Sequence, residues 1–151
     1  MQVRAYRADD HETVLALADR LVEGVAPWRD RTAVLTAVRG WVGDSIAAVG
    51  QDGHAVFVAA DSTGLLGFVS VGERAHFSGC VDAYVGELVV DRSAQGRGVG
   101  RALMARAEQW GRERGHAYLT LETGAANGHA RAFYTALGYL DEDVRLTKPL
   151  R

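Results

Sequence analysis

The sequence has 151 residues, which is the usual size of a single domain with one hydrophobic core. With 48% hydrophobic and 24% charged residues it is neither a disordered segment nor a membrane protein. A formal net charge of −2 argues against nucleic-acid binding, and the single cysteine, Cys80, excludes an intrachain disulfide and any multi-cysteine metal site. We therefore expect one domain over residues 1–151, with no metal, no membrane segment and a cytoplasmic location.

The N-terminal third predicts a strand followed by two helices. Residues 2–7 alternate in the manner of a strand. Asp9 and Glu12 have the spacing of a capping box, and the helix that follows is expected to end near Gly24. A second apolar face with helical spacing runs over roughly 30–48.

The middle of the chain predicts three strands. Residues 55–60 and 65–71 are rich in β-branched and aromatic side chains, and residues 61–64 between them predict a hairpin turn. The polar segment 72–81 is expected to be a loop. The most strand-like run of the sequence, 83–90, follows it.

The C-terminal part predicts a helix, a strand, a second helix and a last strand. The first helix is amphipathic and ends at Arg114, and Tyr118–Glu122 is the strand. Asn127 is a good N-cap for the second helix, which Gly138 would close. Residues 144–150 alternate again. The predicted fold class is therefore mixed α/β, with helices flanking a central sheet.

The glycine-rich segment that follows the strand 83–90 predicts a phosphate site. Glycines allow a tight turn and close approach of a ligand, and the first amides of a helix lack internal partners and lie at its positive end. Three arginines, Arg92, Arg97 and Arg101, strengthen this prediction. They belong to a stretch from 92 to 114 that has six arginines and two acidic residues.

Two common nucleotide motifs are excluded. A Walker loop needs a lysine that this segment lacks. A dinucleotide fingerprint starting at Gly96 needs a third glycine or alanine where Arg101 stands, and one starting at Gly98 needs it where Leu103 stands.

Two ordered motifs resemble the GNAT superfamily of N-acetyltransferases. The motif Gln95-x-x-Gly98-x-Gly100 is similar to the family's acetyl-CoA pyrophosphate loop. Downstream, the run from Asn127 through Phe133 and Tyr134 to Gly138-Tyr139 is similar to its second signature. The predicted order of elements is also the GNAT order, so the resemblance covers the whole chain. It implies a sheet whose strands at 83–90 and 117–122 splay apart.

The resemblance implies that acetyl-CoA donates an acetyl group directly to an amine in a ternary complex. Glu87 stands where the family often has its general base, acting directly or through a water, and Glu122 is a second candidate. Tyr134 matches the tyrosine that protonates the leaving thiolate. A backbone amide near Val89 would face the thioester carbonyl. The remaining residues expected to bind the donor are Leu88, Val90, Gln95, Gly96, Arg97, Gly98, Val99, Gly100, Arg101, Asn127 and Phe133.

The acceptor is expected to be a small molecule with an amino group. Its site would lie between the turn joining the first two helices and the loop 76–82, because acidic side chains there would attract a cation. The candidate contacts are Glu23, Trp28, Asp30, His76, Phe77 and Asp82. The alternatives are a protein N-terminal or lysine acetyltransferase and a non-catalytic acetyl-CoA sensor. The resemblance implies a monomer or homodimer, and the alternation of Val144, Leu146 and Leu150 would allow a strand-mediated dimer.

Overall fold

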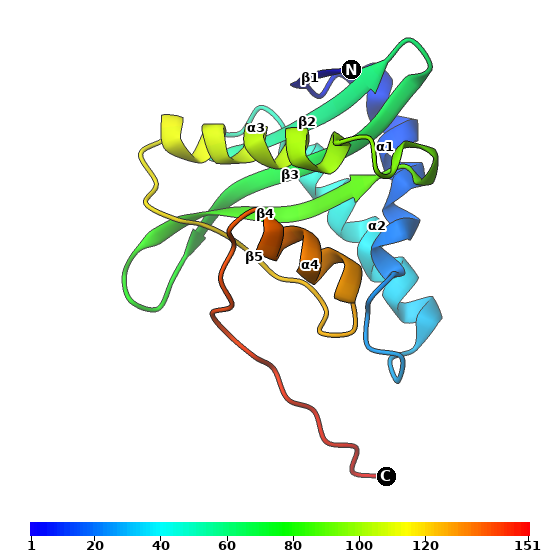
Figure 1. The fold of residues 1–151 in the computed structure, drawn as a ribbon, viewed down its shortest axis with the longest axis vertical. Coiled ribbons are helices and arrows are strands. Elements are labelled where there is room, and N and C mark those ends of the chain that lie inside the picture. Colours follow the sequence, from blue (N-terminus) through cyan, green and yellow to red (C-terminus); the bar gives the residue numbers. More distant parts are fainter.

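The computed structural model describes all 151 residues, and its centre is a five-stranded mixed sheet in the order β1-β2-β3-β4-β5. The first four strands form an antiparallel meander and β5 joins β4 in parallel. Helices cover both faces of the sheet (Figure 1).

The strands are β1 (Gln2–Ala5), β2 (His54–Asp61), β3 (Gly64–Ala75), β4 (Val81–Val90) and β5 (Leu119–Leu121). The α-helices are α1 (His11–Leu17), α2 (Arg31–Ala47), α3 (Val99–Glu113) and α4 (Gly128–Ala136), and the 3₁₀ turns are η1 (Ala8–Asp10), η2 (Ala18–Val22) and η3 (Arg92–Ala94).

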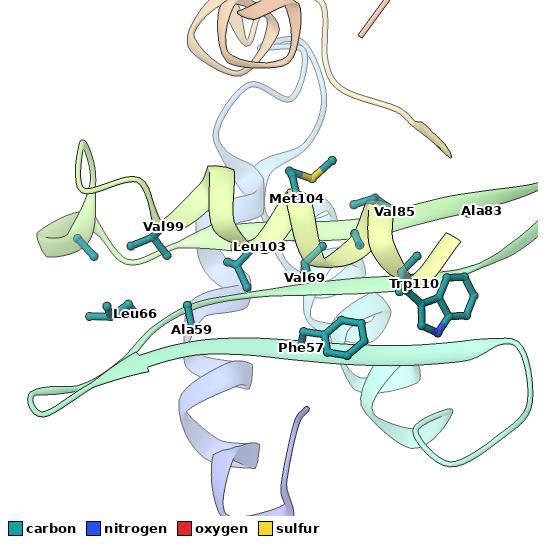
Figure 2. Packing of buried hydrophobic residues seen from close by; sticks show 13 residues of the cluster. Phe57, Ala59, Leu66, Val69, Ala83, Val85, Val99, Leu103, Met104 and Trp110 are labelled. Atoms are coloured by element: carbon teal, nitrogen blue, oxygen red, sulfur yellow. The ribbon is translucent and has the colours of Figure 1, made fainter. Parts of the chain in front are cut away.

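Alternation along the strands divides the core between the two faces. In β2, Phe57 and Ala59 pack under α3, whereas Val56 and Val58 pack against α1 and η2. Leu103 and the other apolar residues of α3 lie on the first face (Figure 2). The amphipathic spacing of α3 therefore places this helix, and the glycine-rich loop before it, against the sheet beside β4.

The strands β4 and β5 pair over only three residues. Ala83, Tyr84 and Val85 are opposite Leu119, Thr120 and Leu121, and the pairing stops there. On its other edge β4 stays paired with β3 as far as Val90. The end of β4 consequently presents an open edge toward the diverging β5, which confirms the predicted splay.

Three expectations about the elements were wrong. Residues 144–150 form no strand, and their apolar side chains are exposed (Leu146 is 89% exposed) because the segment leaves the body of the protein (Figure 1). The segment 72–81 is only partly a loop, since β3 continues to Ala75 and β4 begins at Val81. Asp9 does not cap the first helix. Asp10 instead accepts the amide of Arg7 at 2.8 Å and two hydrogen bonds from Arg4, so α1 begins at His11.

No helix of the chain combines the length and the apolar character needed to cross a bilayer.

Candidate active site

A bulge in β4 lies where β4 and β5 separate. The register between β3 and β4 shifts because Gly86 and Glu87 together face the single residue Ser70. Gly86 has no room for a side chain, since a Cβ there would lie 2.8 Å from the hydroxyl of Ser70. The bulge thus interrupts the alternation of side chains between the two faces of the sheet at Glu87. This is also where the edge of β4 that faces β5 becomes unpaired.

Glu87 is a buried carboxylate held by two hydroxyl groups. It is 5% exposed, and its Oε2 atom accepts hydrogen bonds from Ser70 of β3 and from Ser45 of α2, the latter at 2.8 Å. Burial raises the pKa of this carboxyl above its ordinary value, and the negative charge of Asp44 adds to the rise, while the two serine hydroxyls oppose it. A buried carboxylate with a raised pKa suits a general base that works near neutral pH.

The second candidate base, Glu122, is differently placed. Its side chain is mostly exposed and pairs with Arg74 at 3.0 Å. An exposed, ion-paired carboxylate lacks the desolvation that raises the pKa of Glu87. The geometry therefore favours Glu87 over Glu122.

The direction of the β4 backbone decides which amides face the open edge. The amide of Asp91 donates to Leu66 of β3 at 2.8 Å, and the carbonyl of Val89 also points toward β3, at Gly67. Because successive residues of a strand point their backbone groups to opposite edges, the amides of Leu88 and Val90 face the gap. The sequence predicted that an amide near Val89 would face the thioester carbonyl. The strand direction makes the amide of Leu88 or that of Val90 the candidate, because the amide of Val89 itself points toward β3.

The glycine-rich loop has the conformation of a phosphate site. Gly96 and Gly98 adopt φ angles of +75° and +78°, in the left-handed region that favours glycine. Gly98 is the N-cap of α3, and the first helical hydrogen bond runs from Ala102 to the Gly98 carbonyl. The amides of Val99, Gly100 and Arg101 are therefore left free by the helix at its positive end. Free amides at the positive end of a helix are suited to binding an anion such as a phosphate.

Most of the positive charge near this loop is neutralised by acidic residues from elsewhere in the sequence. Arg97 pairs with Asp61 at 2.8 Å. Hydrogen bonds from the hydroxyl and amide of Thr63, and then that from Arg97, lower the pKa of Asp61 to about 2. Arg92 pairs with Glu23 at 2.5 Å. Arg101 is exposed and has no acidic partner. The local arginine excess in the sequence thus leaves one unpaired cation at the start of α3.

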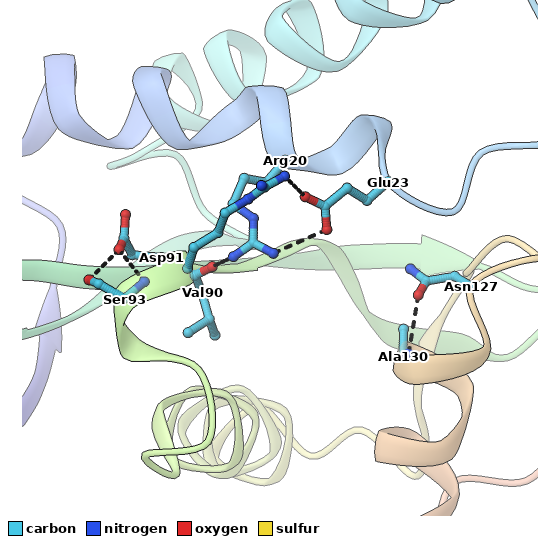
Figure 3. A network of polar contacts seen from close by, with 8 residues as sticks. Arg20, Glu23, Val90, Asp91, Ser93, Asn127 and Ala130 are labelled. Atoms are coloured by element: carbon cyan, nitrogen blue, oxygen red, sulfur yellow. Dashed lines mark hydrogen bonds and ion pairs between the residues drawn. The ribbon is translucent and has the colours of Figure 1, made fainter.

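An arginine that the sequence did not single out lies on the open edge. Arg20 of η2 donates to the carbonyl of Val90 and pairs with Glu23 at 3.1 Å, so Glu23 joins it to Arg92 (Figure 3). The Nε atom of Arg20 is buried and has no hydrogen-bond partner. The end of β4 that the resemblance assigns to the pantetheine arm is therefore contacted by a guanidinium group at the Val90 carbonyl.

On the other side of the gap, α4 carries the C-terminal motif. Tyr134 packs edge-on against Phe133 and Tyr139, and desolvation raises the pKa of its phenol to about 12. Its hydroxyl makes no hydrogen bond to the protein. The ring of Phe133 lies against α3, where a Cβ at Gly100 would be 3.2 Å from it. The third glycine of the loop therefore allows α4 to pack on the helix that begins the phosphate site.

Asn127 has the capping contact expected of it and a second contact across the gap. Its side-chain oxygen accepts the amide of Ala130 at 3.2 Å (Figure 3). A side chain at Gly24 would overlap Asn127, and one at Gly124 would overlap the carbonyl of Gly24. The segment that follows η2 thus touches the segment that follows β5, and both positions require glycine.

The structure does not bring the six acceptor candidates together. The loop with Trp28, which is 61% exposed, and the β3–β4 hairpin with Phe77, which is 93% exposed, lie far apart (Figure 1). Asp82 is buried, and its Oδ1 atom has no hydrogen-bond partner. The other three are engaged within the protein: Asp30 accepts the amide of Ala33 at 2.7 Å as the N-cap of α2, Glu23 pairs with two arginines, and His76 bonds Ser78 at 2.7 Å.

Comparison with known proteins shows the family of the chain. The model of the acetyltransferase (GNAT) family matches residues 16–139. The chain belongs to the GNAT family.

Similar structures share the whole fold. A mutant form of a Bacillus halodurans protein superposes with a TM-score of 0.79 at 19% identity, over 100% of both chains. A putative acetyl transferase from Pyrococcus furiosus gives a TM-score of 0.76 at 23% identity, over 99% of this chain and 100% of that one. AAC(6')-Iy, in complex with the bisubstrate analogue CoA-S-monomethyl-acetylneamine, gives 0.70 at 21% identity, over 99% of this chain and 97% of that one.

One curated relative matches in part. An uncharacterized N-acetyltransferase of Methanocaldococcus jannaschii is 36% identical over 62 residues. This match spans 41% of the present chain and 27% of the relative.

The sequence motifs of this GNAT domain did not reveal three residues of the candidate site. Ser45, Ser70 and Arg20 reach the gap from α2, β3 and η2, which carry none of the family signatures. A lone serine on an apolar strand, as Ser70 is on β3, was the one available signal, because buried hydroxyls need partners. The sequence offered nothing comparable for the other two.

Proposed function

We propose that this GNAT domain transfers the acetyl group of acetyl-CoA directly to a primary amine of a small molecule. The observation that carries the proposal is the buried Glu87 carboxylate at the bulge, beside an open strand edge that leads to a free helix N-terminus. These features lie on one continuous path from a phosphate site to a base. In addition, the structural neighbour AAC(6')-Iy binds an analogue that joins CoA to acetylneamine.

The residues of the chain would act as follows. The amides of Val99, Gly100 and Arg101 bind the pyrophosphate, and the amides of Leu88 and Val90 pair with the pantetheine and orient the thioester. Gln95, Asn127 and Phe133 line this path. Glu87 takes a proton from the acceptor ammonium, which must become neutral before it can attack. Tyr134 remains protonated at neutral pH and supplies a proton to the leaving thiolate.

The acceptor would enter beside the segment that contains Gly24 and Trp28. This segment contacts the far side of the gap at Gly124 and presents an exposed indole next to it in the sequence. Because the carboxylate of Glu23 is paired with Arg20 and Arg92, a cationic acceptor would have to rely on exposed Asp30 for electrostatic attraction.

The test is turnover with a panel of amines, followed as release of free thiol from acetyl-CoA. We expect turnover with small amines and a loss of about 10²-fold to 10⁴-fold in kcat/KM for Glu87→Gln. Turnover restricted to peptides would assign the acceptor to proteins. Tight acetyl-CoA binding without turnover on any amine would identify a sensor and overturn the enzymatic proposal.

We further propose that the protein is cytoplasmic and is a monomer or homodimer. The exposed side chains of Val144, Leu146 and Leu150 are free to pair with a second copy. Light scattering on the full chain distinguishes the two states, and a chain ending at Tyr139 would remain monomeric if this segment forms the dimer.

A further inference from the structure

The hydrogen bonds around Glu87 have a fixed direction. The backbone amide of Glu87 donates to the Oγ atom of Ser70 at 2.9 Å. An amide can only donate, so the single proton of this hydroxyl remains available for the Glu87 carboxylate, to which Ser70 donates. Ser45 donates to the same carboxylate from α2 at 2.8 Å.

Both hydroxyls bind one oxygen of the carboxylate. They converge on Oε2, whereas Oε1 has no hydrogen-bond partner in the protein. A proton on Oε2 would face two O–H donors and would displace at least one of them. A proton on Oε1 leaves both hydrogen bonds in place, so the two oxygens of Glu87 are chemically different.

We propose that Ser70 and Ser45 are positioning residues that hold Oε2 of Glu87 and thereby make Oε1 the atom that accepts the proton of the amine. The inference rests on the proposed function, in which Glu87 is the general base. It assigns a role to two residues that lie outside both family motifs.

The surroundings of Glu87 contain no other group that stabilises its charged form. Asp44 of α2 repels it, and Tyr84 of β4 is close enough for the charge of Glu87 to raise the pKa of the phenol. The strand β3 contributes only the hydroxyl of Ser70. The space for that hydroxyl depends on Gly86, whose missing Cβ would lie 2.8 Å from it. The two serines therefore offset the desolvation of a carboxylate that burial alone would keep protonated to higher pH.

The direct experiment is a carbon-13 NMR titration of the Glu87 side-chain carboxyl in the full protein, assigned by its absence in Glu87→Gln. Ser70→Ala and Ser45→Ala each remove a donor to a charged acceptor, so each should raise the pKa of Glu87 by about one unit. Ser45→Thr keeps a hydroxyl at a half-buried helical position and should restore the wild-type titration. Ser62→Ala, in the exposed β2–β3 turn, is the matched control and should cause no shift.

Kinetics give the second readout. In both alanine variants the acid limb of the kcat/KM–pH profile should shift to higher pH by the same amount as the NMR pKa. The KM for acetyl-CoA should stay unchanged. If Ser70→Ala does not fold, Ser45→Ala decides, because Ser45 lies on α2 outside the sheet.

Two failures are distinguishable. An unshifted Glu87 titration in the folded alanine variants overturns the role of the serines and leaves the base in place. A wild-type pH profile in Glu87→Gln overturns the base itself and with it the inference, whatever the titration shows.

Discussion

The first 111 residues and the last 40 or so are stabilised in different ways. All 29 buried residues lie at or before Gly111, in the meander β1–β4 and the helices that pack on it. Beyond it, the apolar residues that pack against this core are only half-buried; they include Leu121 of β5, Phe133 of α4 and Leu137 just after α4. The first region contains all the fully buried residues, and the second is attached to it by a short strand pairing and by the packing of α4 on α3. The candidate site lies in the gap that this attachment leaves open.

The largest effect should come from a matched pair of phenylalanine substitutions, one in each region. Phe68 of β3 is 1% exposed, so Phe68→Ala should lower the free energy of unfolding by about 3–5 kcal/mol. Phe133→Ala should cost less than half as much, because its half-buried ring leaves a site open to water. Denaturant unfolding with unchanged m-values measures both. Equal losses would show that the second region is as much a part of the core as the first.

The next effect concerns catalysis in the second region. Tyr134→Phe should lower kcat by about 100-fold and leave the affinity for acetyl-CoA unchanged, since it removes a general acid and keeps the ring. The pKa of about 12 keeps the hydroxyl protonated across the working range. Tyr139→Phe is the control, because that phenol donates to Glu108 at 3.1 Å on α3 instead. A kcat that survives Tyr134→Phe removes the tyrosine from the reaction.

The same division explains what the sequence could predict of the fold. In the first region apolar periodicity reports burial directly, so the strands at 55–60, 65–71 and 83–90 and the helix at 30–48 were located within a few residues. In the second region the alternation of 144–150 has the same appearance, yet no neighbouring strand covers it, and no strand forms. Alternation predicts a strand only where a surface exists to bury its apolar face.

The site was predictable to the extent that it depends on the backbone. Gly98 and Asn127 have the helix-end conformation and the capping contact that their motifs predicted. Contacts between distant segments were not predictable. The pairing of Glu23 with Arg92 joins residues 69 positions apart. Together with the local pairing to Arg20, it removes the free carboxylate that the acceptor prediction needed.

A smaller effect should distinguish glycines that the site requires from those that it does not. Gly98→Ala places a side chain at a φ of +78°, which costs about 1–2 kcal/mol and distorts the loop, so acetyl-CoA should bind more weakly. Gly40→Ala, in the middle of α2 with open space around it, should instead stabilise the protein by up to about 1 kcal/mol. Calorimetric titration with acetyl-CoA and thermal unfolding give the two values. An unchanged affinity in Gly98→Ala would contradict the assignment of this loop to the pyrophosphate.

The smallest effect concerns stability, and it links the first region to the site. Burial raises the pKa of Glu87 in the folded protein, so its contribution to stability is complete below the unfolded pKa and declines as the pH rises through the folded one. Glu87→Gln has no such charge to desolvate. The variant should therefore match the wild type near pH 4 and become progressively more stable than it as the pH rises, levelling off above the folded pKa. Unfolding free energies measured from pH 4 to 8 test this. A variant that loses both activity and stability at neutral pH would show that the carboxylate stabilises the fold. A variant that loses activity but gains stability would show that the buried charge destabilises the fold and is retained for the reaction.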